Sequence, residues 1–428
     1  MKPVKIEFTG KNLTGHAGLV QVGRFIDKLG LKASLKKHLD VKRGTNAEYS
    51  LADVVIILTL GAVAGIKHIS QLIILRTDRV LRKIFERGNF PDNSTFGRIL
   101  RLFMPSRCQA LAEVENELRQ KVWSQKHSGT ITLDMDSFVR GVYGSQEGAA
   151  KGYNPEKPGQ KSYHPLLCFI AETRECLHNW YRTGAAYSSN GATEFMKECF
   201  ARLPKGTWKI LVRADSAFFD GELLDYLDLK NAFYLIKVKL RNLVSVLDRQ
   251  VWTPIRRKPG REKTEFYYRP GTWSKARRFV AVRRLIGFVS EGKLFPEPEY
   301  EYFCYVLNEN LSPWEAHKKY GKMATSENWI EWCKNQVAAG SILTRDFWAN
   351  SACFQICILA YNLMVWMMGL TPGRGIHEEP NTIRFWLIKV PARLLSGGRQ
   401  LILKLSCDFW AKERWLQMED VIARLNWG

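Results

Sequence analysis

The sequence lacks the cysteine spacing of a disulfide-rich or zinc-binding protein. Its nine cysteines are scattered along 428 residues, and none belongs to a Cys-x-x-Cys pair. An odd number of cysteines without such pairs argues against a disulfide framework and against a zinc module. We therefore expect reduced, mostly buried thiols. Cys353 and Cys357 are four residues apart on an expected helix, where a shared metal ion is the less favoured alternative.

The sequence also lacks an apolar segment behind its first lysines, so nothing predicts a secretory signal. Two apolar runs further on are poor membrane spans. Residues 51–66 are shorter than the roughly 20 residues that a span needs. Residues 347–370 are long enough, but they contain Asn350, Gln355 and Asn362, which would need polar partners in lipid. We expect buried core helices of an intracellular protein with no membrane attachment, and a membrane helix is the alternative.

Acidic residues are too few to balance the basic ones. The chain has 64 Lys and Arg against 42 Asp and Glu, which gives a formal net charge of +22 at pH 7. A field of one sign and this size favours a polyanionic partner. Because the excess is spread along the chain rather than gathered in one amphipathic helix, nucleic acid is favoured over an anionic membrane surface. A hydrophobic content of 46% is sufficient for folded cores.

The hydrophobic pattern divides the chain into five segments and predicts an α/β fold. Residues 1–125 have a helical period. Residues 129–240 predict three hairpin-linked strands and then alternating helices and strands, which make a mixed sheet with helices on its faces. Residues 241–311 are β-rich and strongly basic, residues 312–370 are helical, and residues 371–428 form a basic helical tail.

One N-terminal helix has the features of a DNA reader. It is expected to begin at Asn93 or Ser94, and it carries Arg98 and Arg101 on one face. A turn that leads into an arginine-bearing helix suits a helix-turn-helix motif. An ordinary surface helix explains the same pattern equally well.

The basic segment combines cations with aromatic side chains. Between Arg256 and Arg284 there are eleven Lys or Arg residues and two acids. The interleaved aromatics are Phe266, Tyr267, Tyr268 and Trp273. Such a mixture favours a surface that stacks bases and follows phosphates. A solvated β-hairpin is the alternative.

Three acids stand at places where an α/β sheet puts its chemistry. Asp134 and Asp136 are two residues apart in an expected strand, so both face the same side. Asp215 ends an apolar strand, and open α/β sheets bind ligands beyond the carboxyl ends of their strands. Tyr320, Glu327 and Lys334 are spaced seven apart, so an unbroken helix would align them on one stripe, with Glu331 beside it.

Carboxylates that gather at one sheet edge repel each other unless cations lie between them. Mg²⁺ meets that need because it accepts carboxylate oxygens, and two ions about 4 Å apart support phosphoryl transfer. Each acid also has a structural alternative. Asp215 could cap the following helix, Glu327 could lie on a solvated face, and Asp134 could pair with an arginine.

Several motifs in residues 129–370 resemble one family of enzymes. LDMDSF, YGSQEG, GYNPEKPGQKSYHPLL, RADSAF and YGKMATSENWIEWCKN resemble the DDE transposases of bacterial insertion sequences, of the cut-and-paste type with a Tyr-Arg-Glu-Lys signature. The resemblance implies an RNase H-like catalytic core with a β-rich insertion between the second and third acids. It also implies Mg²⁺-dependent cutting and rejoining of DNA.

The resemblance assigns the catalytic acids residue by residue. Asp136, Asp215 and Glu327 match the three acids and would hold two Mg²⁺ ions, with Mn²⁺ as a substitute. The family usually has threonine where this chain has Phe138, so Asp134 stays an alternative first acid.

The same resemblance assigns the groups that would contact DNA. Tyr320 and Lys334 match the signature and would position a backbone phosphate, whereas the arginine place holds Met323. Lys322 or Arg345 is the candidate for the missing phosphate contact. Trp273 would hold a base flipped out beside the cut, and Arg98 and Arg101 would bind the terminal repeats.

The prediction is therefore a transposase that binds insertion-sequence ends and joins them to target double-stranded DNA. Pairing two ends implies a homodimer in the DNA complex. The expected location is the bacterial cytoplasm, with the protein associated with the nucleoid when it is bound to DNA. A structure-selective RNase H-like nuclease and a non-catalytic DNA-binding protein derived from a transposase are the alternatives.

Overall fold

The structure, a computed structural model, describes residues 2–39, 41, 44, 47–86, 89–154, 157–187, 189–289, 296–371, 378–398 and 400–427. It divides into two compact units. One contains Lys126–Gly141 and Ala149–Trp329 and is called the sheet unit below. The other contains Met1–Gln125, Val142–Gly148 and Ile330–Gly428 and is called the helical unit.

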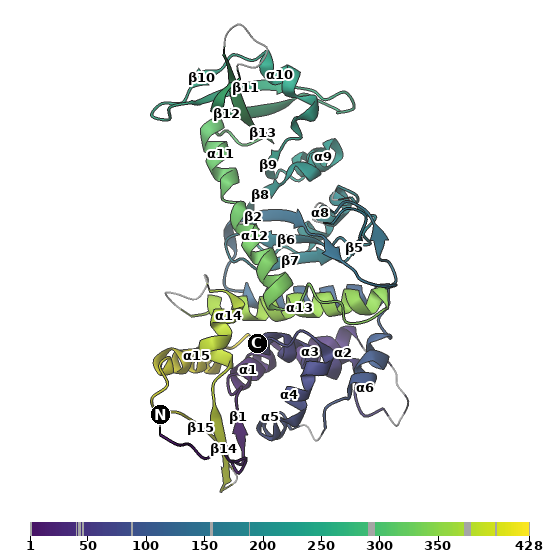
Figure 1. The fold of residues 1–428 in the computed structure, drawn as a ribbon, viewed down its shortest axis with the longest axis vertical. Helices are drawn as coiled ribbons and strands as arrows, with labels where there is room; N and C mark the ends of the chain where they lie inside the picture. Colours follow the sequence, from purple (N-terminus) through teal and green to yellow (C-terminus); the bar gives the residue numbers. More distant parts are fainter. Residues whose placement is uncertain are drawn as a thin grey trace. The chain divides into compact units, whose positions relative to one another are not determined.

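The sheet unit is built on one large mixed sheet (Figure 1). In the described residues this sheet has nine strands in the order β10-β11-β12-β13-β9-β8-β2-β6-β7. Their bounds are β2 Ser128–Ser137, β6 Leu166–Ile170, β7 Cys176–Trp180, β8 Thr207–Ala214, β9 Phe233–Lys237, β10 Thr253–Pro254, β11 Arg261–Tyr268, β12 Arg277–Val289 and β13 Glu297–Leu307. β2, β8 and β9 run parallel, and the other neighbours are antiparallel. The predicted α/β class, a mixed sheet with helices, is confirmed.

The predicted β-rich insertion does not form a separate sheet. It begins with the short helix α10 (Val244–Asp248), and its last strand, β13, pairs with β9 from Tyr305 opposite Lys237 to Leu307 opposite Leu235. The four strands of the insertion therefore extend the sheet that carries the predicted acids. A second small sheet in this unit contains β3 (Arg140–Gly141), β5 (Lys161–Tyr163) and β4 (Ala150–Lys151).

Helices cover both faces of the large sheet. Cys168 of β6 lies opposite Met135 of β2 and His178 of β7, so these three side chains share one face. The His178 ring stacks on Phe195 of α8 (Ala192–Ala201) at 5.1 Å, which places α8 on that face. Asp134 and Asp136 point to the opposite face, because side chains alternate along a strand. α9 (Gly221–Leu229) packs against α8 and β9.

The helix after the insertion is broken, whereas the alignment of Tyr320, Glu327 and Lys334 on one stripe required an unbroken helix. α11 (Pro313–Gly321) opens with the predicted capping box between Ser312 and Glu315. It ends before Lys322 and Met323, and α12 follows (Ala324–Glu331). Beyond α12 the chain continues as a π-helical turn, η4 (Trp332–Gln336). The break and the π turn both shift the helical phase, so the straight stripe of Tyr320, Glu327 and Lys334 was wrong.

The helical unit packs its helices around a long buried one, α13 (Phe347–Gly369), which contacts α3 and α7. Its N-terminal helices confirm the helical prediction for residues 1–125. They are α1 (Leu19–Leu29), α2 (Leu31–His38), α3 (Leu51–Ala64), η1 (Ile69–Leu72), α4 (Ile73–Thr77), α5 (Arg79–Ile84), α6 (Asn93–Leu100) and α7 (Pro105–Val122).

α13 is the single helix of the described residues that is by itself long and apolar enough to cross a membrane, and 83% of its most apolar window is buried inside the protein. α3 with Ile69–Thr77 passes the same test as a pair bent by 91°. Two of the three amides noted in α13 have partners. Asn350 bonds to Thr344, and Asn362 donates to Glu115 of α7. Both contacts suit the predicted core helix.

The C-terminal segment was predicted to be helical, and this is wrong for part of it. It contains α14 (Pro380–Ile383), the π turn η6 (Arg384–Ile388) and α15 (Lys412–Arg424). Between them β14 (Ala392–Gly397) and β15 (Gln400–Leu405) form a hairpin, and β1 (Leu13–Thr14) pairs with β14. The turn contains Gly397 and Gly398, and Gly398 has φ +55°, a conformation that glycine adopts without strain.

Two local predictions have clear outcomes. The cap of α6 is Asp92 rather than Asn93 or Ser94, since its side chain accepts a hydrogen bond from the Thr95 N–H at 2.6 Å. All nine cysteines carry free thiols, and only Cys407 is exposed, which confirms the prediction of mostly buried thiols.

Candidate active site

The parallel register of β2 and β8 brings two of the predicted acids together. Met135 lies opposite Ala214 in this ladder. Asp136 and Asp215 each follow by one residue, at the carboxyl ends of neighbouring strands that are about 4.8 Å apart. The register also pairs Asp134 with Arg213 one step earlier. All four side chains face the same side of the sheet because they alternate in phase.

Asp134 forms a buried ion pair with an arginine. Arg213 donates from Nε to Oδ1 and from Nη2 to Oδ2, both at 2.7 Å, and the Asp134 side chain is fully buried. Burial raises the pKa of Asp134 to about 6, although the Arg213 guanidinium opposes the shift. The structural alternative for Asp134, a pairing with arginine, is therefore what the structure contains.

Asp136 is half-buried and lies among like charges. Its Oδ1 accepts a hydrogen bond from the Ser137 N–H at 2.7 Å. Burial raises the pKa of Asp136 to about 7, and the negative charge of Asp215 and then that of Glu327 contribute to the rise. The charges of Asp215 and Glu327 therefore both act on Asp136. We call Asp136, Asp215 and Glu327 the acid triad.

Asp215 has a structural role as well. Its Oδ1 accepts a hydrogen bond from the Ala217 N–H at 2.9 Å, so it caps the short helix η2 (Ser216–Phe218). Burial raises the pKa of Asp215, while Lys237 and Lys239 act in the opposite direction. Capping uses one carboxylate oxygen and fixes the side chain at the end of β8.

Glu327 reaches the same side of the sheet from α12. The helix is anchored by Trp329, which is 2% exposed and whose ring lies 5.7 Å from that of Phe169. Phe169 lies opposite Asp134 in the β2–β6 ladder and so shares its face. The Glu327 residue itself is exposed, as the structural alternative anticipated.

The acid triad does not form a finished metal site. Among the described residues there is no group of three or more His, Cys, Asp or Glu side chains that could hold a metal ion as they stand. The donor chemistry nevertheless suits a hard divalent cation, because oxygen ligands whose charges repel each other gain from a cation between them.

Tyr320 belongs to the same environment. Its ring lies 4.8 Å from that of Tyr305, and it is half-buried near the end of α11. Burial raises the pKa of Tyr320, and the charges of Asp215, Asp136 and Asp134 add to the effect. Of its neighbours in the chain, Lys322 is exposed, and Met323, which occupies the arginine place of the signature, is 5% exposed.

Four other predicted DNA contacts belong to the helical unit. Arg98 and Arg101 are exposed at the end of α6, and Arg98 donates a hydrogen bond to Thr95 at 3.0 Å. Lys334 lies in the π turn η4, and Arg345 is exposed in the loop before α13. Their roles in binding DNA stay predictions.

Most of the aromatic residues in the insertion pack together instead of forming an open stacking surface. Phe266 stacks on Phe279 at 5.5 Å, and Tyr268 meets the same ring edge-on at 5.9 Å. Trp273 is half-buried, and its ring centroid lies 4.8 Å from that of Phe219. Phe219 is four residues after Asp215. Tyr267 is 71% exposed. The predicted surface was therefore wrong for Phe266, whereas the role of Trp273 toward DNA stays a prediction.

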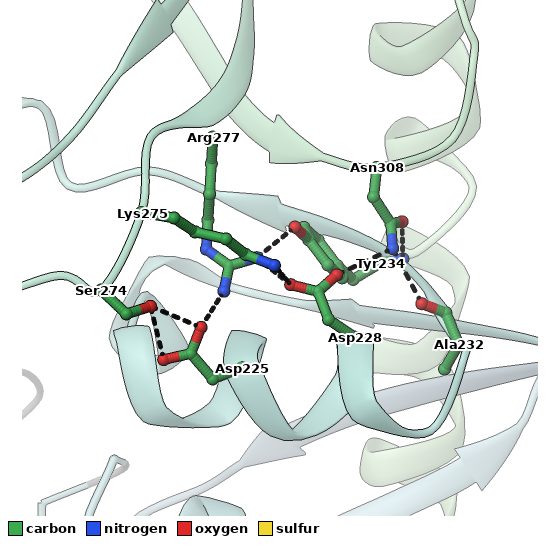
Figure 2. Close-up of polar contacts among 8 residues, drawn as sticks. All are labelled: Asp225, Asp228, Ala232, Tyr234, Ser274, Lys275, Arg277 and Asn308. Carbon is green, nitrogen blue, oxygen red and sulfur yellow. Dashed lines mark hydrogen bonds and ion pairs between the residues drawn. The ribbon is translucent and has the colours of Figure 1, made fainter.

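Part of the positive charge of the insertion is neutralised by acids. Figure 2 shows Arg277 bonded to Asp225 and Asp228 of α9 and to the hydroxyl of Tyr234. Further pairs cross the strands, namely Arg278 with Glu265 at 2.7 Å and both Arg283 with Glu262 and Arg284 with Glu301 at 2.6 Å. The Arg277 bonds attach the insertion to α9, and all of these pairs together leave fewer of its cations for DNA than the sequence count suggested.

Sequence reasoning missed two residues beside the acid triad. Arg213 is two residues before Asp215, as Asp134 is two before Asp136, and that matching spacing was a readable signal for a pair between parallel strands. His164 is 2% exposed and lies 3.1 Å from the Ser137 hydroxyl through Nε2. Nothing in the local sequence predicts the contact of His164, because it depends on how the strands pair.

The whole chain matches one protein family. The family described as Transposase DDE domain group 1 matches residues 1–427. No protein of the curated set matches the chain. Among solved structures, a piggyBac transposase synaptic complex with hairpin DNA is similar, with 13% identity and a TM-score of 0.46, over 86% of this chain and 79% of that one.

Proposed function

The chain belongs to the group 1 family of transposase DDE domains, and from this premise we propose that it binds the ends of a bacterial insertion sequence, cuts them and joins them to target DNA. The observation that carries the proposal is that Asp136 and Asp215 directly follow the paired residues Met135 and Ala214 of two parallel strands, with the charge of Glu327 acting on Asp136.

The choice between Asp134 and Asp136 as first acid favours Asp136. Both carboxylate oxygens of Asp134 accept from Arg213, and breaking a buried pair of this kind is costly. Asp136 has no such cation beside it among the causes that shift its pKa. We therefore assign the catalytic role to Asp136, Asp215 and Glu327.

The strand order supports an RNase H-like core. Within the nine-stranded sheet, the run β7-β6-β2-β8-β9 combines an antiparallel meander with three parallel strands. The first two acids follow adjacent parallel strands, and the third lies on a helix after the insertion. This is the arrangement expected of such a core.

The proposed cofactor is a pair of Mg²⁺ ions held by the acid triad. When bound, these ions would supply positive charge that favours the attacking oxygen and stabilises the leaving oxygen of a phosphodiester. The residues of the chain do the rest. Asp136 and Asp215 must be ionised to serve as ligands, and the cap on Asp215 keeps its carboxylate at the strand end.

Other residues would hold the DNA. Tyr320 would orient the phosphate beside the cut, with Lys334 and Lys322 as further contacts. Trp273 lies against Phe219, close in sequence to Asp215, and would receive a base displaced at the cleavage site. Arg98 and Arg101 would bind the terminal repeats in a homodimer that pairs two ends.

The test is incubation of the protein with its own flanking DNA, with Mg²⁺ or with EDTA. Excised element and joined product in Mg²⁺ alone are expected, and Asp215→Asn should abolish both while it still shifts the DNA in a gel. Nicked DNA without joined product would indicate a nuclease. Shifted DNA that is never cut would indicate a binding protein, and either result would overturn the proposal.

A further inference from the structure

We propose that Arg213 is a positioning residue for the proposed reaction, because one guanidinium fixes Asp134 in the sheet and also holds the end of α11, from which Tyr320 and α12 follow. The inference rests on the proposed function for its catalytic consequence. Its structural part, the anchoring of α11, stands on the geometry alone.

The guanidinium uses all of its three nitrogens. Nε and Nη2 donate to the two oxygens of Asp134 at 2.7 Å each, and Nη1 donates to the Lys319 carbonyl at 2.8 Å. Arg213 is 4% exposed. A planar fork with donors in fixed directions is specific to arginine, since the lysine ammonium is a single point of charge.

The Lys319 carbonyl lies in the last turn of α11, which ends at Gly321. Carbonyls in the last turn lack partners within the helix and need a donor from elsewhere. Arg213 provides that donor from β8. The helix end is thereby tied to the strand that leads to Asp215.

The hydrogen bond from Arg213 to the Lys319 carbonyl lies directly before the helix break. Tyr320 follows Lys319, and Lys322 and Met323 separate α11 from α12, which carries Glu327. Arg213 thus bonds from β8 to the last turn of α11, directly before the segment that leads to the third acid, whereas the Tyr305 hydroxyl of β13 lies 2.9 Å from Nδ1 of His317, nearer the middle of the helix. Loss of the Arg213 bond would free this segment to shift relative to Asp136 and Asp215.

A purely structural role for Arg213 predicts a different effect of the Arg213→Lys substitution. If Arg213 only neutralised Asp134, Lys would serve nearly as well, because an ammonium also pairs with a buried carboxylate. If Arg213 positions α11, Lys fails, because it cannot bond to Asp134 through two nitrogens and reach the Lys319 carbonyl as well. Arg213→Lys therefore separates the two roles.

The matched control is Arg202→Lys. Arg202 is also buried in the sheet unit, at 6% exposure, and donates to the Glu198 carbonyl at 3.1 Å at the end of α8. It lies on the helix that covers the opposite face of the sheet from the acid triad. A general effect of replacing a buried arginine should appear in both variants.

The experiment measures cleavage of end DNA at saturating Mg²⁺ and hydrogen exchange of the amides in residues 319–327. For Arg213→Lys we expect a fall in kcat of about 10-fold or more with KM for DNA within about twofold, since misplacement of catalytic groups acts on the chemical step. Exchange in residues 319–327 should also rise. Arg202→Lys should leave both unchanged.

The outcomes distinguish this inference from the proposed function. If the wild-type protein does not cut DNA, the proposed function fails, while the exchange data still report on the anchoring of α11. If Arg213→Lys cuts at the wild-type rate, or if both variants lose activity and exchange protection alike, Arg213 is a structural ion pair and the inference is wrong.

Discussion

At the residue scale, Asp136 connects the electrostatics of the fold with its proposed chemistry. Its pKa is about 7 because of burial and because Asp215 and Glu327 repel its charge. In the unfolded chain the same group has a pKa near 3.8. The folded state therefore binds this proton more tightly, so the free energy of unfolding should fall as pH rises from about 4 to about 7 and level off above that.

Asp136→Asn tests this relation. Asparagine carries no charge at any pH, so the variant should be more stable than the wild type at pH 8 without metal, by up to about 4 kcal/mol. At pH 4 the difference should vanish. Thermal unfolding at both pH values measures it. Addition of Mg²⁺ at pH 8 should raise the midpoint of the wild type and not that of Asp136→Asn, and equal responses would contradict the assignment.

The buried pair of Asp134 and Arg213 leads to a second prediction at this scale. Arg213→Met leaves the fully buried Asp134 without its cation and should lower the free energy of unfolding by about 3–5 kcal/mol. The double variant Asp134→Leu with Arg213→Met should recover most of the loss, because two apolar side chains replace both charges. Urea unfolding of the two variants measures the difference. A double variant as unstable as Arg213→Met would show that the pair contributes in another way.

At the element scale, an aromatic contact attaches α12 to the sheet. Trp329 packs on Phe169, and the Arg174 guanidinium lies 5.9 Å from the Trp329 ring centroid. Trp329→Ala should cost about 3–5 kcal/mol and should abolish cleavage by freeing Glu327. The exposed Trp410 offers a control, since Trp410→Ala should change neither property. Retained cleavage in Trp329→Ala would show that α12 holds Glu327 by other contacts.

The elements also show what the sequence could and could not predict. Period-two alternation and end-of-strand placement predicted β2, β8 and their acids, because those signals are local. The break at Lys322 and Met323 follows Gly321, a weak helix former, but the bond from Arg213, 106 positions before Lys319 in the chain, has no such local signal. The hairpin of β14 and β15 was predicted as helix, although the Gly-Gly pair between its strands is a turn signal in the sequence. Long-range pairing decided the features that local patterns missed.

At the scale of the whole molecule, the net charge of +22 dominates the proposed encounter with DNA. Binding should weaken with salt, and the slope of log K against log salt should be about −0.9 for each phosphate neutralised. Arg98→Glu with Arg101→Glu should weaken binding to end DNA and reduce this slope by about two. Fluorescence anisotropy across a salt series measures it. A slope unaltered by this double substitution would remove α6 from the binding surface.

The central claim is that Asp136, Asp215 and Glu327 share divalent cations. The most direct measurement is anomalous diffraction from Mn²⁺-soaked crystals of the protein with its end DNA. The account predicts anomalous peaks between the Asp136 and Asp215 carboxylates, with Glu327 turned toward them. A fully occupied DNA complex with no peak at these three carboxylates would contradict it.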